Sequence, residues 1–228
     1  MSTPQNPQAP AQAPAAPVSV PVSREQSIAI FSQTMGLVAI TCLFAALGAY
    51  IGRDLGGLWF LLPWILALGC IIGLNVANSR GKTQLALVLL FATGLLLGIS
   101  IGYTVKYYAV TDASAVYQAV GATALFVAAL GAGGYAIRKD LSFLFRFLFF
   151  ALLALIVFAI VLVFVNLPGG MLAFSILGLV LFGAYVVVYF NVLRRAGQEM
   201  VIPLAAGIFI SILNIFLFFL QIFGGGGR

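Results

Sequence analysis

Long apolar runs dominate the chain from residue 28 onward, and short polar breaks separate them. Each run is close to the roughly 20 residues that an α-helix needs to cross a bilayer. The runs are continuous rather than alternating, which excludes the ten-residue strands of a membrane β-barrel. The pattern predicts an all-α integral membrane protein whose seven transmembrane helices span Ile28–Ile51, Gly57–Ala77, Gln84–Val105, Ala115–Ile137, Phe143–Val165, Gly170–Val192 and Val201–Phe223.

Composition supports a membrane location. Hydrophobic residues make up 63% of the 228 residues and charged residues only 7%, against averages of about 45–50% and 25% in soluble domains. So few charged side chains cannot cover the surface of a soluble globule of this size. We therefore expect residues 25–228 to form a transmembrane domain embedded in the lipid bilayer.

The amino-terminal stretch differs in composition from the rest of the chain. Residues 2–21 contain six prolines, with alanine and glutamine between them and no charged side chain. Such a segment buries too little apolar surface to offset the entropy of ordering. We expect residues 1–24 to form a disordered cytoplasmic tail, with docking of a proline-binding partner as an alternative use.

The basic residues predict the orientation of the bundle. With seven spans, one face holds eight of them, namely Arg24, Arg80, Lys82, Arg138, Lys139, Arg146, Arg194 and Arg195. The other face holds Arg53, Lys106 and Arg228. Because Lys and Arg accumulate in cytoplasmic loops, we expect a multi-pass protein of the inner or plasma membrane with its amino terminus in the cytoplasm.

Residue content excludes several kinds of chemistry. The chain contains no histidine, and Cys42 and Cys70 both lie inside apolar runs. Histidine-dependent nucleophile systems and imidazole or thiolate metal sites are therefore not expected. The carboxylates all fall in loops, which argues against buried proton relays. Because the basic residues are scattered at helix ends, nucleic acid is not an expected partner. We expect no enzymatic activity and no cofactor.

Glycines four residues apart mark faces on which helices approach closely. The third helix carries Gly94, Gly98 and Gly102, the first carries Gly48 and Gly52, and the second carries Gly69 and Gly73. These faces suit either a homodimer interface or packing inside the bundle. Since seven helices must pack together, we favour packing inside the bundle.

Neutral polar and small residues recur at helical spacing in the last two helices. They are Gly207, Ser211, Asn214, Phe218 and Gln221 in the seventh helix, and Ser175, Gly178, Phe182, Tyr185 and Tyr189 in the sixth, with Asn191 close by. The candidate binding residues are Ser211, Asn214, Tyr185, Tyr189 and Asn191. They suit either interhelical hydrogen bonds, worth about 0.6 kcal/mol each, or the lining of a narrow polar pathway.

The stretch from Gly133 to Ser142, GGYAIRKDLS, followed by Phe-Leu-Phe, resembles a signature of the Bax inhibitor family, which includes the YccA-like and transmembrane Bax-inhibitor-motif proteins. The ends of the first and last helices and the start of the fourth are also similar to this family. The signature residues here are Gly134, Tyr135, Arg138, Lys139, Asp140 and Ser142.

This resemblance implies a fold in which the last helix is central and wrapped by the other six. It also implies two activities, a pH-sensitive calcium leak and modulation of membrane-protein proteolysis or stress survival. The leak depends on an aspartate pair, but Phe190 (or Asn191, with a one-residue slip) and Ser211 stand at those positions. A pH gate built on paired carboxylates therefore cannot form.

These observations predict a non-enzymatic regulator of membrane-protein proteolysis or stress survival that acts through protein partners, such as a membrane protease. The alternative is a passive calcium or cation leak between the sixth and seventh helices, without the aspartate gate. The missing carboxylates favour the regulator.

Overall fold

The computed structural model describes residues 24–165 and 167–225. In this part of the chain, seven helices are long and apolar enough to cross a membrane. The helices are α1 (Arg24–Gly52), α2 (Leu61–Ser79), α3 (Thr83–Thr111), α4 (Ala113–Ala136), α5 (Leu144–Phe164), α6 (Gly170–Leu193) and α7 (Val201–Phe223). Short 3-10 turns precede α2 and α7, at Gly57–Phe60 and Gln198–Met200. The predicted all-α fold with seven spans is confirmed.

The helix ends follow the sequence pattern closely, with one clear exception. The seventh helix has the predicted bounds, but α3 continues through Lys106 to Thr111, where a break was expected. Asp112 alone separates it from α4, and the Asp112 carboxylate accepts a hydrogen bond from the Ala115 backbone N–H at 3.3 Å. Hydropathy detects the edge of the bilayer, whereas a helix can continue past it, as α3 does up to Asp112, the N-cap of α4. Residues 1–23 of the predicted tail lie outside the described residues, and its last residue, Arg24, begins α1.

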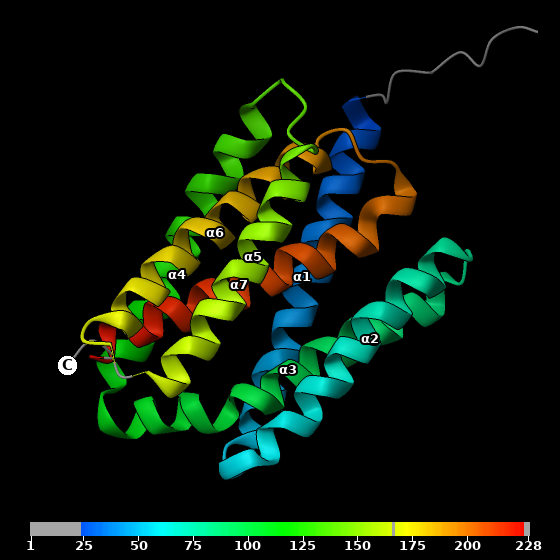
Figure 1. The fold of residues 1–228 in the computed structure, drawn as a ribbon. Helices are drawn as coiled ribbons and strands as arrows, with labels where there is room; N and C mark the ends of the chain where they lie inside the picture. Colours follow the sequence, from blue (N-terminus) through cyan, green and yellow to red (C-terminus); the bar gives the residue numbers. More distant parts are fainter. Residues whose placement is uncertain (1–23, 166, 226–228) are drawn as a thin grey trace, which may run out of the picture.

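The last helix occupies the centre of the bundle. Figure 1 shows α7 running obliquely between the group of α4, α5 and α6 and the group of α1, α2 and α3. It packs against α6, α4, α1, α3 and α2. The most apolar stretch of α7 is 61% buried, whereas that of α5 is 6% buried. The predicted central position of the seventh helix is therefore confirmed.

The glycine faces of α1 and α3 pack against each other. Gly94, Gly98 and Gly102 lie directly against the α1 backbone, and Gly48 and Gly52 lie against the backbone around Ile99. A Cβ atom at any of the five would overlap backbone or side-chain atoms of the opposite helix. The predicted packing inside the bundle is confirmed for these glycines. Of the two α2 glycines, Gly69 faces open space and Gly73 meets a single side chain of α3.

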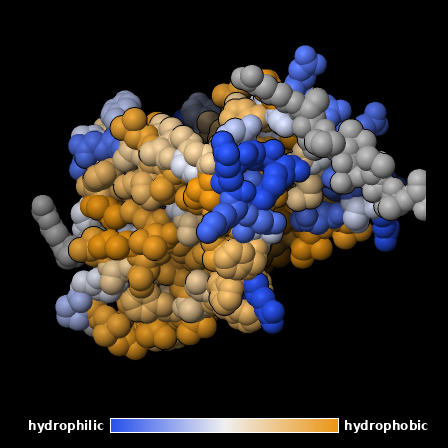
Figure 2. Space-filling view, turned by 90° about the horizontal axis from the view of Figure 1, so that it is seen from above, coloured by the Kyte–Doolittle hydropathy of each residue, from blue (hydrophilic) through white to orange (hydrophobic). Residues whose placement is uncertain are grey.

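Side-chain hydrogen bonds join three segments at the end of the bundle where α1 begins. Asn78 Nδ2 donates to the carbonyl oxygen of Glu199 at 2.9 Å, and Gln198 Nε2 donates to Gln33 Oε1 at 2.7 Å. The loop between α6 and α7 is therefore tied to the last turn of α2 and to α1. Figure 2 shows hydrophilic residues gathered at this end, with hydrophobic residues over the flanks.

The two ends differ in charge as predicted from the sequence. The end where α1 begins carries the eight basic residues of that face, at the start of α1, in the α2–α3, α4–α5 and α6–α7 loops and in the first turn of α5. At the opposite end, Lys106 Nζ and Arg53 Nε lie 2.5 and 3.4 Å from the carboxylate oxygens of Asp54. The third basic residue of that face, Arg228, lies outside the described residues. The cytoplasmic position of the amino terminus stays a prediction.

Candidate functional site

The two predicted polar stripes lie face to face along α6 and α7. The Tyr189 ring of α6 lies against Gly207 of α7, and the Phe218 ring of α7 lies against Gly178 of α6. Farther along, Ser175 Oγ donates a hydrogen bond to Gln221 Oε1 at 2.5 Å. These three pairs belong to one antiparallel register, because the residue number rises along α7 by as much as it falls along α6.

In this register Ser211 lies opposite Tyr185, and both residues are buried. The hydroxyl of Ser211 donates to the Gly207 carbonyl oxygen at 2.8 Å. Asn214 Nδ2 donates in the same way to the Ile210 carbonyl oxygen at 2.8 Å. The polar groups in the middle of α7 are therefore satisfied within their own helix, as is common for Ser in membrane helices.

Aromatic rings fill the remaining space between α5, α6 and α7. The Tyr185 and Tyr189 rings are stacked with centroids 5.9 Å apart, and the Phe145 ring of α5 lies 5.1 Å from Tyr189. Beyond them, the Phe182 and Phe218 rings lie 6.0 Å apart across the two helices. We call these five rings the α6–α7 aromatic cluster. Ring packing of this kind excludes water from the interface, since interiors are close-packed.

Asn191 belongs to a different group from the other four candidate residues. Its side chain is 1% exposed and reaches the loop between α4 and α5. The Nδ2 atom donates to the carbonyl oxygens of Ile137 at 2.8 Å and Lys139 at 3.1 Å. The Oδ1 atom accepts from the backbone N–H of Leu141 at 3.0 Å and from Arg195 at 2.7 Å. One buried amide therefore holds the backbone of the signature loop.

A second contact fixes the same loop to the end of α6. Arg195 donates to Asp140 Oδ1 at 2.8 Å, and the same oxygen accepts from the Ser142 backbone N–H at 2.8 Å. Hydrogen bonds from Ser142, followed by the Arg195 guanidinium, hold the pKa of the Asp140 carboxyl below its ordinary value. We call Asn191, Arg195, Asp140 and the loop backbone from Ile137 to Leu141 the loop clamp.

Other signature residues seat α4 against its neighbours. Gly134 allows α4 to reach the α6 backbone at Val187, where a Cβ atom would overlap the Val187 carbonyl. The Tyr135 ring packs edge-on against Phe31 of α1, with centroids 5.5 Å apart. Arg138 is exposed at this end. The signature thus holds the end of α4 and its loop against α1 and α6.

Sequence reasoning missed the link between Asn191 and the signature, and it did not single out Arg195 for a role. One signal was available. An asparagine inside the last turn of an apolar helix, with an arginine four residues later on the same face, has two polar groups that must find partners. Nothing in the spacing says that those partners lie some 50 residues earlier, in the α4–α5 loop.

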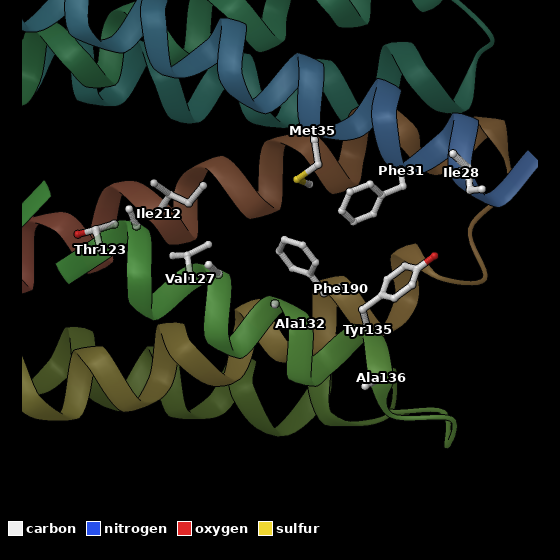
Figure 3. Close-up of a pocket in the computed structure, with 13 residues that line it drawn as sticks. Ile28, Phe31, Met35, Thr123, Val127, Ala132, Tyr135, Ala136, Phe190 and Ile212 are labelled. Atoms are coloured by element: carbon white, nitrogen blue, oxygen red, sulfur yellow. The ribbon is translucent and has the colours of Figure 1, made fainter. Parts of the chain in front are cut away.

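Phe190, which with Asn191 as the alternative stands where the resemblance implies an aspartate, points into a cavity between α1 and α4 (Figure 3). The cavity has a volume of about 680 Å³, and its walls are almost entirely apolar. The Phe190 ring lies 6.3 Å from the Phe31 ring and against Gly131 of α4. Ser211 faces a different side of the bundle, toward α6, so Phe190 and Ser211 do not form a site together.

Over the described ranges, no group of three or more His, Cys, Asp or Glu side chains is arranged to hold a metal ion. Cys42 and Cys70 are free thiols on α1 and α2. The candidate residues therefore form two structural groups, the α6–α7 aromatic cluster with its neighbouring polar groups and the loop clamp.

Comparison with known proteins agrees with this architecture and with the signature. The family model described as "Inhibitor of apoptosis-promoting Bax1" matches residues 28–228. The chain belongs to the Bax inhibitor family. The match covers all seven spans as well as the loop clamp, so the family resemblance of the signature is confirmed.

Relatives of this Bax inhibitor family protein occur in several bacteria. An uncharacterized protein of Pseudomonas aeruginosa is 29% identical to it, over 87% of this chain and 90% of the relative. An uncharacterized membrane protein of Vibrio cholerae is 25% identical, over 86% and 88%. The uncharacterized protein YrjE of Lactococcus lactis is 27% identical, over 76% of each. This distribution fits a multi-pass protein of a bacterial cell membrane.

Proposed function

We propose that this Bax inhibitor family protein is a non-enzymatic regulator that binds other integral membrane proteins, with a membrane protease as the partner class. It would thereby control proteolysis of membrane proteins or survival under stress. The observation that carries the proposal is the state of the α6–α7 interface. The Ser211 and Asn214 side chains bond within α7, Ser175 bonds to Gln221 across the interface, and the aromatic cluster fills the space between them, which favours a packed scaffold over a reaction or conduction site.

The α5 helix offers the surface for such a partner. It packs against α6 and exposes large side chains elsewhere, including Phe150 at 59% and Val157 at 60% exposure. A partner helix in lipid gains from van der Waals packing against such a surface rather than from hydrophobic burial. The loop clamp holds the start of α5 in place, so the surface is preorganised, and less ordering entropy opposes binding.

Site-specific photo-crosslinking in bacterial membranes tests the proposal. A photo-reactive residue replaces Phe150 or Val157 on α5, and the matched control replaces Val88, which is 63% exposed on α3. We expect a discrete adduct with a membrane protease subunit, identified by mass spectrometry, from α5 but not from α3. We also expect deletion of the protein to change the half-life of that protease's substrates. Lipid adducts alone at all three positions, with unchanged half-lives, would overturn the proposal.

The alternative function is a passive cation leak between α6 and α7. The Ser175–Gln221 hydrogen bond favours it, because it places two polar side chains across the interface at one end. A continuous route would require displacement of the Tyr189 and Phe218 rings, which lie against the glycines of the opposite helices.

Calcium flux into proteoliposomes separates the two functions. We expect the purified protein to give no flux above empty vesicles at pH 6 or pH 8. We expect a Tyr189→Ala, Phe218→Ala double variant, which removes two rings of the aromatic cluster, to leak equally at both pH values, since Ser and Asn do not titrate there. Substantial native flux would establish the leak as the function in place of the regulator.

A further inference from the structure

A second cavity continues the first one along the groove between α1 and α4. It has a volume of about 740 Å³ and shares Thr123, Ala124 and Ile212 with the cavity of Figure 3. The helices α1 and α4 flank it without packing closely against each other, and α7 forms its floor with Phe209 and Phe216. The two cavities therefore follow one another from one end of the bundle toward the other.

The shape and lining of the second cavity fit a hydrocarbon chain. The α1 wall presents the small side chains of Ala45, Ala46 and Ala49, and Ala46 and Ala124 are exposed, so the groove opens sideways to the membrane. From Cys42 to Gly52, α1 rises about 15 Å, which is half of a roughly 30 Å hydrocarbon core. The volume lies within the range of ligand pockets, about 300–1,000 Å³. The groove thus matches one leaflet in length.

The end of this cavity nearest the loop between α1 and α2 is basic. Arg53 and Lys106 both line it, and the Arg53 guanidinium carbon lies 4.2 Å from the centroid of the Tyr50 ring. Asp54 is the one carboxylate that pairs with these two cations in the described chain, and the side chains of Arg53 and Lys106 are 46% and 47% exposed. One positive charge of this cluster is therefore left uncompensated at the mouth of an apolar groove. In contrast, the residues that line the cavity of Figure 3 include no charged side chain.

We propose that this groove binds one anionic phospholipid, with an acyl chain between α1 and α4 and the phosphate at the exposed sides of Arg53 and Lys106, next to the Asp54 carboxylate that already pairs with both. A phosphate placed there makes charge-assisted hydrogen bonds to both cations. Tyr50 lies at the level where aromatic residues meet lipid headgroups. The site is independent of the proposed function, because it lies on the opposite side of α7 from the α6–α7 aromatic cluster and at the opposite end from the loop clamp.

Native mass spectrometry of the full chain in detergent tests the site. Phosphatidylglycerol and phosphatidylcholine with the same acyl chains are titrated separately, so that only the headgroup charge differs. We expect one phosphatidylglycerol per chain, bound at least tenfold more tightly than phosphatidylcholine. We expect an Arg53→Gln, Lys106→Gln variant to lose this preference, while an Arg80→Gln, Lys82→Gln variant, with the same change of charge at the other end, retains it.

The groove itself is tested by filling it. Ala124→Phe places a ring in the space for the acyl chain and should weaken the binding of both lipids at least fivefold. Leu125 is 76% exposed and does not line the cavity, so Leu125→Phe should leave the affinity for both lipids unchanged. Ala46→Phe fills the same space from α1 and decides the question if the Ala124 variant does not fold, as judged by circular dichroism.

Three outcomes would overturn the proposal. The first is equal affinity of the native protein for the two lipids. The second is an equal loss of the phosphatidylglycerol preference in the Arg80→Gln, Lys82→Gln variant, which would indicate a non-specific electrostatic effect. The third is unchanged lipid binding in a folded groove-filling variant.

Discussion

Substitution of Asn191 by alanine should release the signature loop from α6. The Asn191 side chain is 1% exposed and makes close hydrogen bonds to Ile137, Lys139 and Leu141 of the loop at 2.8, 3.1 and 3.0 Å. Alanine removes all of them and leaves two carbonyl groups and one N–H without their partner. Arg195 also loses its acceptor at 2.7 Å, although it keeps Asp140.

The expected cost is about 2–3 kcal/mol of unfolding free energy. A net hydrogen bond contributes about 0.5–1.5 kcal/mol, and an unsatisfied buried group costs about 1–3 kcal/mol. Three close bonds would give more than this if the loop were dry. Because Ile137, Lys139 and their neighbours are exposed at the end of the bundle, water replaces part of the lost bonding. The expected loss of unfolding free energy therefore lies below the sum for three dry hydrogen bonds.

Asn214→Ala is the matched control. Its Nδ2 atom donates to the Ile210 carbonyl oxygen within α7, and this oxygen is already an acceptor in the helix. The cost of this control substitution should stay below about 1 kcal/mol, near the average measured for such contacts in membranes. Both variants remove the same side chain from a membrane helix, so their difference isolates the loop clamp.

The assay is unfolding in mixed micelles of increasing SDS content, followed by circular dichroism, with hydrogen exchange of the peptide covering residues 137–142. Asn191→Ala should lower the stability and speed exchange in that peptide, whereas the control should do neither to a comparable extent. Equal stability of the two variants, or unchanged exchange of the loop, would refute the reasoning that Asn191 holds the signature in place.

Two further predictions concern packing and pH. Gly98→Val should lower the unfolding free energy by about 3 kcal/mol or more in the same assay, because its added atoms meet α1 backbone that cannot move away. In the control Gly69→Val, no neighbour lies within 4 Å, and the unfolding free energy should stay within about 0.5 kcal/mol of that of the native protein. The hydrogen bonds of the Asp140 carboxylate from Ser142, followed by its contact with Arg195, should stabilise the protein above the ordinary aspartate pKa of 3.8 and lose this effect as the pH falls below it, since the folded pKa is lowered. The thermal midpoint should therefore fall on acidification, and less steeply in Asp140→Asn; identical profiles would contradict this.

Much of the membrane architecture could be predicted from the sequence. Each span is a local property, because about 20 apolar residues suffice to form a helix in lipid whatever the neighbouring helices are. The exact agreement at Val201–Phe223 and the failure at Lys106 have the same origin. Hydropathy reports where the bilayer ends; α7 begins and ends with its apolar run, whereas α3 continues past its own run as far as Asp112.

The sequence by itself determined the seven spans, the charge difference between the two ends and the small or polar faces of individual helices. Only the tertiary structure decided which faces meet. It brought Gly98 against α1, set Tyr189 on Gly207, placed Asn191 in the signature loop and left a groove ending at Arg53 and Lys106. The physical reason is that periodicity describes one helix at a time, whereas hydrogen-bond satisfaction and close packing depend on the rotation and register of helices far apart in the chain.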